Sequence, residues 1–458
     1  MKKFLSVFLA AVLLAGACLV PAHAVSDVPD ITAEGAVVMD FTTGEVLFEK
    51  GADTQLYPAS LTKILTALVV LENLSMGKTL KADEEVASTG GSRLKMKNGE
   101  QISAKDALYA MMIGSCNDLA VLLAKAVSGS VSEFCKLMND KAKELGCTGT
   151  NFVNPNGLHA DDHYTTAHDM AIITRAAMQS PVFRDIVRSE AYKLTRGKGA
   201  EKPETVETIT TTNWLLNDTT HTMYVGSSRR TPKYEGCIGI KTGHTPQARG
   251  CLAAAATRDG STMLTIVLHS DGDSNGSYER FVDSIKLLDW AFANYRTVSV
   301  LKMGMEMGTL KVKKGKTNKV SAVLASDVYA TLSSDQDDSM ITYDVELDKT
   351  IKAPFNQGTV CGKVTVKHDG EFAGEYEIVT AAAVKEGGFF SNFGISDEVV
   401  KKIGKILLFV IIAAFLIFAG YIGALKIKSE RIKKRKAARA KARREAEERE
   451  RERDKGLF

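Results

Sequence analysis

Cysteine is scarce in this sequence, with seven residues out of 458. They are Cys18, Cys116, Cys135, Cys147, Cys237, Cys251 and Cys361. No two are separated by only two residues, and their spacing shows no regular pattern. A body of about 400 residues buries a core large enough to fold without disulfide staples. We therefore expect no obligatory disulfide framework.

Most of the chain also lacks an excess of basic residues, although the formal net charge of the whole chain is +4. The basic residues concentrate in 426–458, which hold 15 Lys+Arg against 7 Asp+Glu. Subtracting this tail and the pair Lys2 and Lys3 leaves a net charge of −6 for residues 25–425. A mildly acidic body gives no support for nucleic-acid binding, so we expect no nucleic-acid partner.

Two long runs lack any charge, and the first lies near the N-terminus. Residues 1–24 begin with two lysines, continue as an apolar stretch and end in Ala-His-Ala, the three-part pattern of a secretory signal peptide. The mature chain is then expected to start at Val25. Lipidation of Cys18 is a weaker alternative, because the position three residues before it is Ala15 and not the usual large apolar residue.

The second uncharged run, 406–425, is about 30 Å long as a helix, enough to span a bilayer. A buried core helix would need a domain around it, whereas a basic tail follows at 426–458. By the positive-inside rule this tail is cytoplasmic, so the body lies on the extracytoplasmic face of the cell membrane. Residues 386–405, which contain Gly387, Gly388, Ser391 and Asn392, are expected to be a linker.

The body divides into two predicted domains. In 25–297, alternating strand patterns at both ends enclose long apolar helices, expected at 60–74, 104–127, 131–145, 166–179 and 277–295. This arrangement predicts an α+β domain with an antiparallel sheet and a helical cluster. In 298–385, short alternating stretches and an Asp369-Gly370 turn predict a small all-β domain.

A serine and a lysine three residues apart open the apolar helix of the first domain, at Ser60 and Lys63. Four SxxK matches occur in the chain, and only this one begins a long apolar helix. A serine helix cap is the simpler alternative, but a cap favours an acidic residue at the third helical position. A lysine against apolar surface and the positive helix end loses its proton more easily, so it can serve as a base.

Two further triplets follow in the sequence. Ser115-Cys116-Asn117, the only SxN, lies in a polar turn between two apolar helices, where a helix cap is the alternative interpretation. Lys241-Thr242-Gly243, the only KTG, ends a strand pattern and alone would be an ordinary strand segment. The order SxxK, SxN, KTG is the signature of penicillin-binding proteins and serine β-lactamases.

On these motifs the sequence resembles the low-molecular-mass penicillin-binding proteins of the serine-type D-Ala-D-Ala carboxypeptidase family. The resemblance extends to PASLTKILTAL, NFVNPNGLHADDHYTTAHDMA, GIKTGHT and the KLLDWAF helix, and covers nearly all of residues 30–385. It implies a β-lactamase/transpeptidase-like catalytic domain. The family's usual anchor is an amphipathic helix on the outer membrane face, whereas this chain has a predicted spanning segment.

The resemblance also implies roles for individual residues. Ser60 would be the nucleophile and Lys63 its base, Ser115 would relay a proton to the leaving amine, and Asn117 would hold Lys63 and the substrate amide. The substrate's terminal carboxylate would be bound by Lys241 and Thr242. Residues expected to shape the rest of the site are Gly243 along the strand edge, His244 through its backbone N–H in the oxyanion hole, and Arg280 near the carboxylate. For Arg280, a surface helix arginine is the alternative.

The expected substrate is a peptidoglycan stem peptide ending in D-Ala-D-Ala, with β-lactam antibiotics as inhibitors and no cofactor. Three alternatives remain: a DD-endopeptidase, a β-lactamase, and a non-catalytic peptidoglycan-binding module. The pair His159 and His163 has the spacing of a zinc-binding helix but lies in a loop and lacks the following glutamate, so no metal is expected. The oligomeric state is not predicted.

Overall fold

The computed structural model describes residues 27–197, 205–272 and 278–454, so the signal peptide expected at 1–24 lies outside the described residues. The chain forms two compact units. The first comprises the residues up to Leu301, Val328–Thr342 and His368–Glu371, and the second Lys302–Asp327, Tyr343–Lys367 and the residues from Phe372 onward.

A five-stranded antiparallel sheet with the order β2-β1-β11-β10-β9 forms the centre of the first unit. Its strands are β1 Gly35–Asp40, β2 Val46–Lys50, β9 Cys237–Thr245, β10 Arg249–Arg258 and β11 Ser261–Ser270. Alternate residues of each strand point to opposite faces, so Val38 packs with one hydrophobic cluster and Val37 with another. Both faces are therefore covered.

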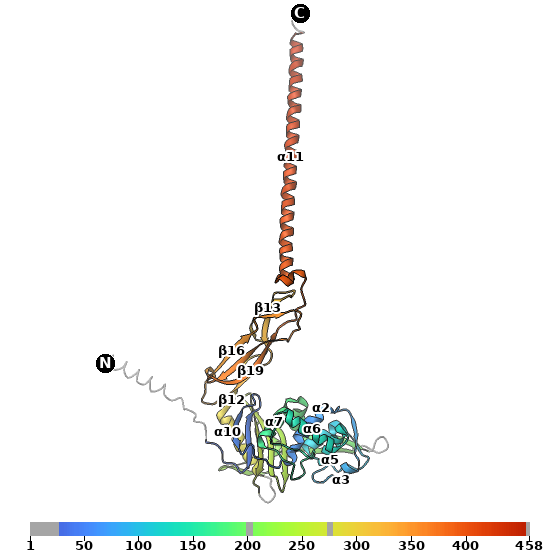
Figure 1. Ribbon diagram of the computed structural model, residues 1–458, viewed down its shortest axis with the longest axis vertical. Coiled ribbons are helices and arrows are strands. Elements are labelled where there is room, and N and C mark those ends of the chain that lie inside the picture. Colours follow the sequence, from blue (N-terminus) through green and yellow to red (C-terminus); the bar gives the residue numbers. More distant parts are fainter. Residues whose placement is uncertain (1–26, 198–204, 273–277, 455–458) are drawn as a thin grey trace, which may run out of the picture. The chain divides into compact units, whose positions relative to one another are not determined.

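Helices cover the two faces of this sheet, as Figure 1 shows for the first unit. The helix α10 (Glu279–Asn294) lies on one face and contributes Phe281, Ile285 and Leu288 to the core. The other face carries a cluster made of α2 Thr62–Asn73, α3 Glu84–Ser88, α4 Ala104–Ile113, α5 Asn117–Ser128, α6 Val131–Glu144, α7 Ala167–Gln179 and α8 Pro181–Val187. The predicted α+β architecture is confirmed.

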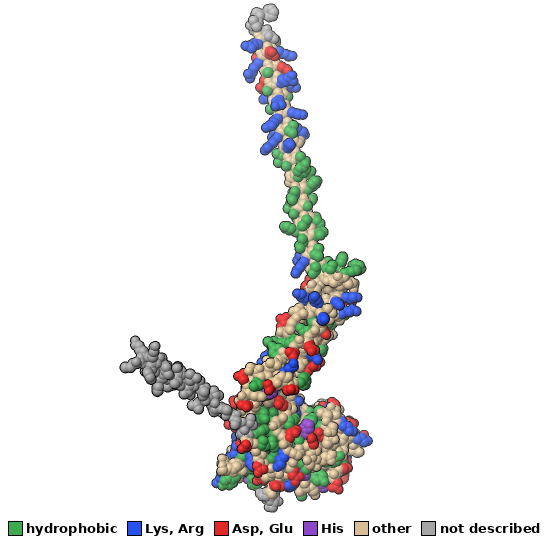
Figure 2. Space-filling view, turned by 60° about the vertical axis from the view of Figure 1, so that its left-hand side comes forward, with side chains coloured by type: hydrophobic (Ala, Val, Ile, Leu, Met, Phe, Trp, Pro, Cys, Tyr) green, Lys and Arg blue, Asp and Glu red, His purple; other side chains and the backbone are tan. Residues whose placement is uncertain are grey.

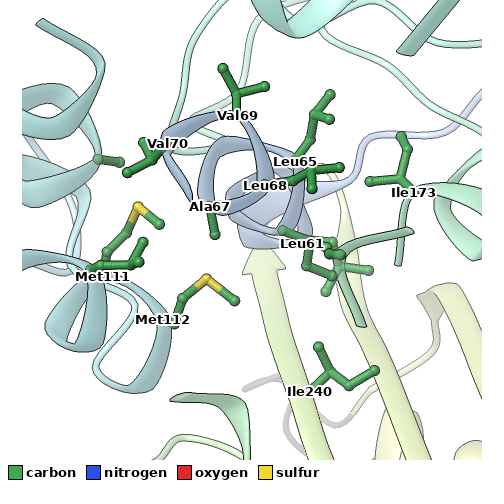
Figure 3. Packing of buried hydrophobic residues seen from close by; sticks show 14 of the residues in the cluster. Leu61, Leu65, Ala67, Leu68, Val69, Val70, Met111, Met112, Ile173 and Ile240 are labelled. Atoms are coloured by element: carbon green, nitrogen blue, oxygen red, sulfur yellow. The ribbon is translucent and has the colours of Figure 1, made fainter. Parts of the chain in front are cut away.

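The central helix of the cluster is α2. All residues from Thr62 to Val70 are buried, so this helix is enclosed on every side. Figure 3 shows its side chains surrounded by Met111 and Met112 of α4, Ile173 of α7 and Ile240 of β9. Because α2 is packed on every side, the position of its first turn is fixed.

Smaller elements complete the first unit. They are the 3-10 turns η1 Ala59–Leu61 and η2 Asp338–Met340, the sheet β3 Thr79–Lys81, β4 Gln101–Ser103, β5 Ala191–Gly197 and β6 Thr205–Thr210, the helix α9 Trp214–Asn217, and the pairs β7 Met223–Val225 with β8 Ser228–Arg230 and β12 Tyr295–Leu301 with β15 Val328–Ser333. The expected helix over 104–127 is interrupted at 114–116, where Ser115 adopts a left-handed φ of 57°.

The second unit is built on a six-stranded sheet with the order β16-β18-β19-β14-β13-β17. Its strands are β13 Glu306–Lys313, β14 Lys319–Leu324, β16 Ile341–Leu347, β17 Thr350–Lys352, β18 Val360–His368 and β19 Glu371–Thr380. The turn η3 Phe389–Phe393 and the helix α11 Asp397–Asp454 follow. The helix begins inside the stretch expected to be a linker and continues through the apolar run into the basic tail.

Candidate active site

The turn before α2 presents Ser60. Ser60 lies in η1, where the preceding Ala59 has a left-handed φ of 46°, and α2 itself is capped by Leu61 without a side-chain hydrogen bond. Ser60 is therefore not a helix cap. Its hydroxyl contacts the amine of Lys63 one turn on, with 2.8 Å between Oγ and Nζ.

Lys63 is fully buried and makes three polar contacts. Besides Ser60, its Nζ donates to Oδ1 of Asn117 at 2.7 Å and to the backbone oxygen of Asn156 at 2.5 Å. Burial lowers the pKa of Lys63 well below its usual value, and the nearby Lys241 lowers this pKa further. A neutral amine that donates its two hydrogens to the two oxygen acceptors turns its lone pair toward Ser60, so it can take the proton of the hydroxyl.

The turn between α4 and α5 places the SxN residues beside this pair. Ser115 is 8% exposed, and its Oγ accepts a hydrogen bond from Nζ of Lys241 at 3.0 Å. Asn117 is the first residue of α5, and its Nδ2 donates to the oxygen of Gly90 at 2.9 Å, which fixes its Oδ1 toward Lys63. Burial raises the pKa of Cys116 to about 12, so this thiol stays protonated and packs as an apolar side chain.

The KTG residues lie on β9, an edge strand of the central sheet. Burial, followed by the charge of Arg280, lowers the pKa of Lys241 to about 7. A Cβ atom on Gly243 would lie 3.1 Å from the backbone nitrogen of Ser60, so the strand passes directly against the nucleophile turn. The side chain of His244 is exposed, and this residue directly follows Gly243. A free strand edge beside a serine can receive an extended peptide as an added strand.

Arg280 belongs to this site and is not a surface helix arginine. It stands at the second position of α10, and its Nη1 donates to the backbone oxygen of Gly243 at 3.1 Å. Its Nε is buried and has no hydrogen-bond partner within the described part of the chain. Burial lowers the pKa of the guanidinium from its usual value.

Four residues of the site were not identified from the sequence. Asn156 supplies the oxygen that binds Lys63, and Thr212 places its Oγ1 2.6 Å from Oγ1 of Thr242. A Cβ on Gly157, which has a φ of +81°, would lie 1.8 Å from the oxygen of Ala59. The sequence Asn-Pro-Asn-Gly at 154–157 could have indicated Asn156 and Gly157, since a loop of this composition presents backbone oxygens and requires its glycine.

The fourth such residue is His163, which supports the nucleophile turn. Its Nδ1 accepts from the backbone of Val153 at 3.2 Å, so Nε2 carries the proton and donates to Oγ1 of Thr62 at 2.8 Å. Thr62 in turn donates to the oxygen of Ala59. Both ring nitrogens are thus used within the protein. No group of three or more potential ligands for a metal occurs among the described residues.

The site combines a serine activated by a buried lysine, an SxN turn and a cationic strand edge, all on a transpeptidase-like fold. These features define the class of serine acyl-transfer enzymes to which the penicillin-binding proteins belong. Comparison with known proteins narrows this class. Residues 22–272 match the family described as D-alanyl-D-alanine carboxypeptidase, and residues 295–386 match the C-terminal domain of penicillin-binding protein 5.

Individual relatives agree with these matches. The D-alanyl-D-alanine carboxypeptidase DacF of Bacillus subtilis (strain 168) is 32% identical over 364 residues, which cover 78% of this chain and 87% of that protein. DacA of Escherichia coli (strain K12) is 30% identical over 80% of this chain and 87% of its own length. The crystal structure of penicillin-binding protein 5 from Haemophilus influenzae superposes with a TM-score of 0.61 at 29% identity, and covers 79% of this chain and 100% of that one.

The chain belongs to the D-alanyl-D-alanine carboxypeptidase family, within the low-molecular-mass penicillin-binding proteins. It is a serine-type D-Ala-D-Ala carboxypeptidase that acts on peptidoglycan.

Proposed function

We propose that the enzyme removes the terminal D-alanine from peptidoglycan stem pentapeptides through an acyl-enzyme on Ser60, and so limits crosslinking of the wall. The observation that carries this proposal is the 2.8 Å contact between Ser60 and a fully buried Lys63 whose pKa is lowered. A serine without a neighbouring base is a weak nucleophile, and this contact supplies the base.

In the first step, Lys63 takes the proton of Ser60 while Oγ attacks the carbonyl between the two D-alanines. The backbone N–H groups of Ser60 and His244 stabilise the developing oxyanion, each contributing on the order of 3–4 kcal/mol to lowering the barrier. The close approach of Gly243 to Ser60 supports this pairing of donors from two elements. Asn117 keeps Lys63 in place and binds the substrate amide.

In the second step, Lys63 gives up the proton that it took from Ser60, and the leaving D-alanine amine receives a proton through the Ser115 hydroxyl. Water later releases the shortened peptide from Ser60. The 3.0 Å contact between Ser115 and Lys241 supports a fixed position of the Ser115 hydroxyl in the site. Lys241, Thr242 and Arg280 bind the terminal carboxylate. The buried Nε of Arg280 supports its part in this binding, since a carboxylate oxygen can satisfy it.

β-Lactam antibiotics acylate the same serine. Their ring carbonyl and carboxylate present the geometry of D-Ala-D-Ala to Ser60 and Lys241, and the resulting ester hydrolyses slowly. The enzyme is therefore inhibited as well as labelled by penicillin.

The enzyme works at the extracytoplasmic face of the cell membrane, held there by α11. By length and composition α11 is the one helix within the described ranges that could cross a membrane, and none of its apolar stretch is buried. The net charge of +8 on 426–458 supports a cytoplasmic location for that tail. A signal peptide at 1–24 would direct export.

The test uses the full chain in detergent, a peptide ending in D-Ala-D-Ala, and labelled penicillin. Wild type should release D-alanine and become labelled, and Ser60→Ala should do neither. Ser75→Ala, at an exposed serine that also begins an SxxK match, is the matched control and should behave as wild type. Labelling of Ser60→Ala at the wild-type rate, or no D-alanine from wild type, would refute the mechanism.

A further inference from the structure

The turn η3 exposes three phenylalanine side chains just before α11. Phe389, Phe390 and Phe393 are 72%, 52% and 70% exposed, whereas Ser391 between them is 3% exposed. Their rings contact one another, with centroids 5.7 Å apart for Phe389 and Phe390 and 5.4 Å apart for Phe389 and Phe393. We call these three residues the aromatic knuckle. Clustered, exposed aromatic rings of this kind mark a surface that meets an apolar partner.

A strongly basic loop is bonded to the backbone next to the knuckle. Residues 311–319 contain five lysines and no acidic residue, and we call them the lysine loop. The backbone N–H of Gly387 donates to the oxygen of Lys314 at 2.9 Å, and Lys316 donates to the oxygen of Lys385 at 3.1 Å. Figure 2 shows hydrophobic side chains gathered at the foot of α11, with lysine and arginine side chains close by.

The knuckle is also tied to the first turn of α11. The N–H of Gly388 donates to Oδ1 of Asp397 at 2.8 Å, and Ile395 donates to the oxygen of Phe390 at 3.2 Å. Nine helical positions, about 13.5 Å of rise, lead from Asp397 to Ile406, where the apolar run begins. The headgroup layer on each side of a bilayer is about 5–8 Å thick, so the backbone of the knuckle lies next to the outer surface of this layer when α11 spans the membrane, and its exposed rings are the part that can reach the headgroups.

We propose that the aromatic knuckle and the lysine loop dock on the outer leaflet, where the rings enter the headgroup region and the lysines bind anionic phospholipid. Phenylalanine side chains of interfacial segments bury at the boundary between headgroups and acyl chains, and each lysine near an anionic surface contributes about 1 kcal/mol of attraction. The surface would hold the second unit against the membrane in addition to the span. This inference rests on the proposed membrane span of α11.

The test places a tryptophan in the knuckle of the full chain and reconstitutes it in phosphatidylcholine vesicles that contain phosphatidylglycerol and brominated acyl chains. In Phe393→Trp, the brominated acyl chains should quench at least half of the fluorescence that the introduced tryptophan adds to that of the parent chain. Phe372→Trp is the matched control, because Phe372 is 70% exposed but is the second residue of the ten-residue strand β19, near the end away from Thr380. Its fluorescence should stay unquenched, as should that of the parent chain, whose tryptophans are Trp214 and Trp290.

The lysine loop is tested in the same vesicles with and without phosphatidylglycerol. Quenching of Phe393→Trp should increase with phosphatidylglycerol, and adding Lys313→Glu and Lys316→Glu should remove that increase. Equal quenching in both lipids would overturn the binding of anionic headgroups.

Equal fluorescence of the two tryptophan variants in vesicles that retain the chain would overturn the docking surface while leaving the span intact. Loss of the parent chain from floated vesicles would overturn both. A change of the added fluorescence with protein concentration, but not with lipid bromination, would assign the knuckle to a second copy of the chain. Release of D-alanine, measured in parallel, reports separately on the catalytic proposal.

Discussion

Three cationic side chains of the candidate active site act on one another. Lys241 lowers the pKa of Lys63, and Arg280 lowers the pKa of Lys241. The two lysines have opposite tasks in the proposed mechanism, because Lys63 must be neutral to act as a base while Lys241 must be charged to bind a carboxylate. Acylation should therefore rise with pH as Lys63 loses its proton and fall again as Lys241 loses its own, near pH 7 in the free enzyme.

Arg280→Met should shift the pH at which the acylation rate declines. Without the guanidinium, the pKa of Lys241 rises from about 7, so the alkaline decline of the acylation rate shifts to higher pH, even though the rate itself decreases. The measurement is the rate of penicillin labelling across pH 5–10. Arg188→Met, at an exposed arginine, is the control and should leave the profile unchanged. A decline at the same pH in Arg280→Met would show that the guanidinium does not act on Lys241.

His163→Gln should weaken both the nucleophile turn and the response of stability to acid. Burial lowers the pKa of His163 to about 4, from an unfolded value of about 6.5, so the unfolded chain binds a proton between these values and the folded one does not. The contribution of His163 to the free energy of unfolding therefore falls as pH drops from about 6.5 to 4, and is constant above that window.

In His163→Gln this fall should be shallower but not absent, because the pKa of His269 is also about 4 and adds in the same direction. At pH 7.5 the variant should lose about 1–3 kcal/mol, the cost of an unsatisfied buried group. Acylation should be about tenfold slower at unchanged penicillin affinity, equivalent to about 1.4 kcal/mol of the barrier. Urea unfolding at several pH values measures the slope, and identical slopes in the two proteins would contradict the assignment.

The loop at 154–157 and the turn η1 form a contact that depends on one glycine. Gly157→Ala would put a methyl group 1.8 Å from the oxygen of Ala59, so the turn that carries Ser60 must move. We expect a loss above about 4 kcal/mol in stability and no penicillin labelling.

Gly260→Ala is the matched control, since Gly260 has nearly the same φ, +83° against +81°, but open space around its Cβ. It should cost only the conformational strain of about 1–2 kcal/mol and keep normal labelling. If both variants lost labelling equally, strain and not contact would be the cause.

The elements differ in how far the sequence predicts them. Periodicity predicts α2 and α7 closely, since helices expected at 60–74 and 166–179 run from Thr62 to Asn73 and from Ala167 to Gln179, because burial dictates both the apolar pattern and the structure. It does not predict the contact of Asn156 with Lys63, since a backbone oxygen leaves no side-chain signature. Pairing of distant strands, such as β12 with β15, is likewise hidden, because alternation predicts a strand but not its partner.

The whole molecule combines a catalytic unit with the helix α11, the proposed anchor, whose apolar stretch takes no part in the core. A chain that ends at Gly394 lacks α11, of whose apolar stretch no residue is buried, so the main contacts that the remaining fold loses are the hydrogen bonds of residues 395–398 to η3 and to Lys316. This truncated chain should release D-alanine at the wild-type rate and remain soluble in high-salt buffer, whereas the full chain should sediment with membranes. Fractionation followed by penicillin labelling measures both. A truncated chain that aggregates or fails to be labelled would show that α11 supports the fold.

The crowding of cations around Lys241 has a consequence for inhibitor discovery. The cationic side chains around Lys241 repel one another in the protein without ligand, and a bound carboxylate relieves this repulsion. Because only the folded state brings these side chains together, a carboxylate ligand binds the folded state and not the unfolded chain. Noncovalent ligands with a carboxylate should raise the melting temperature of the Ser60→Ala protein, while their neutral amides should not. Thermal-shift screening of a catalytically dead protein would then detect compounds that occupy the site without forming an ester.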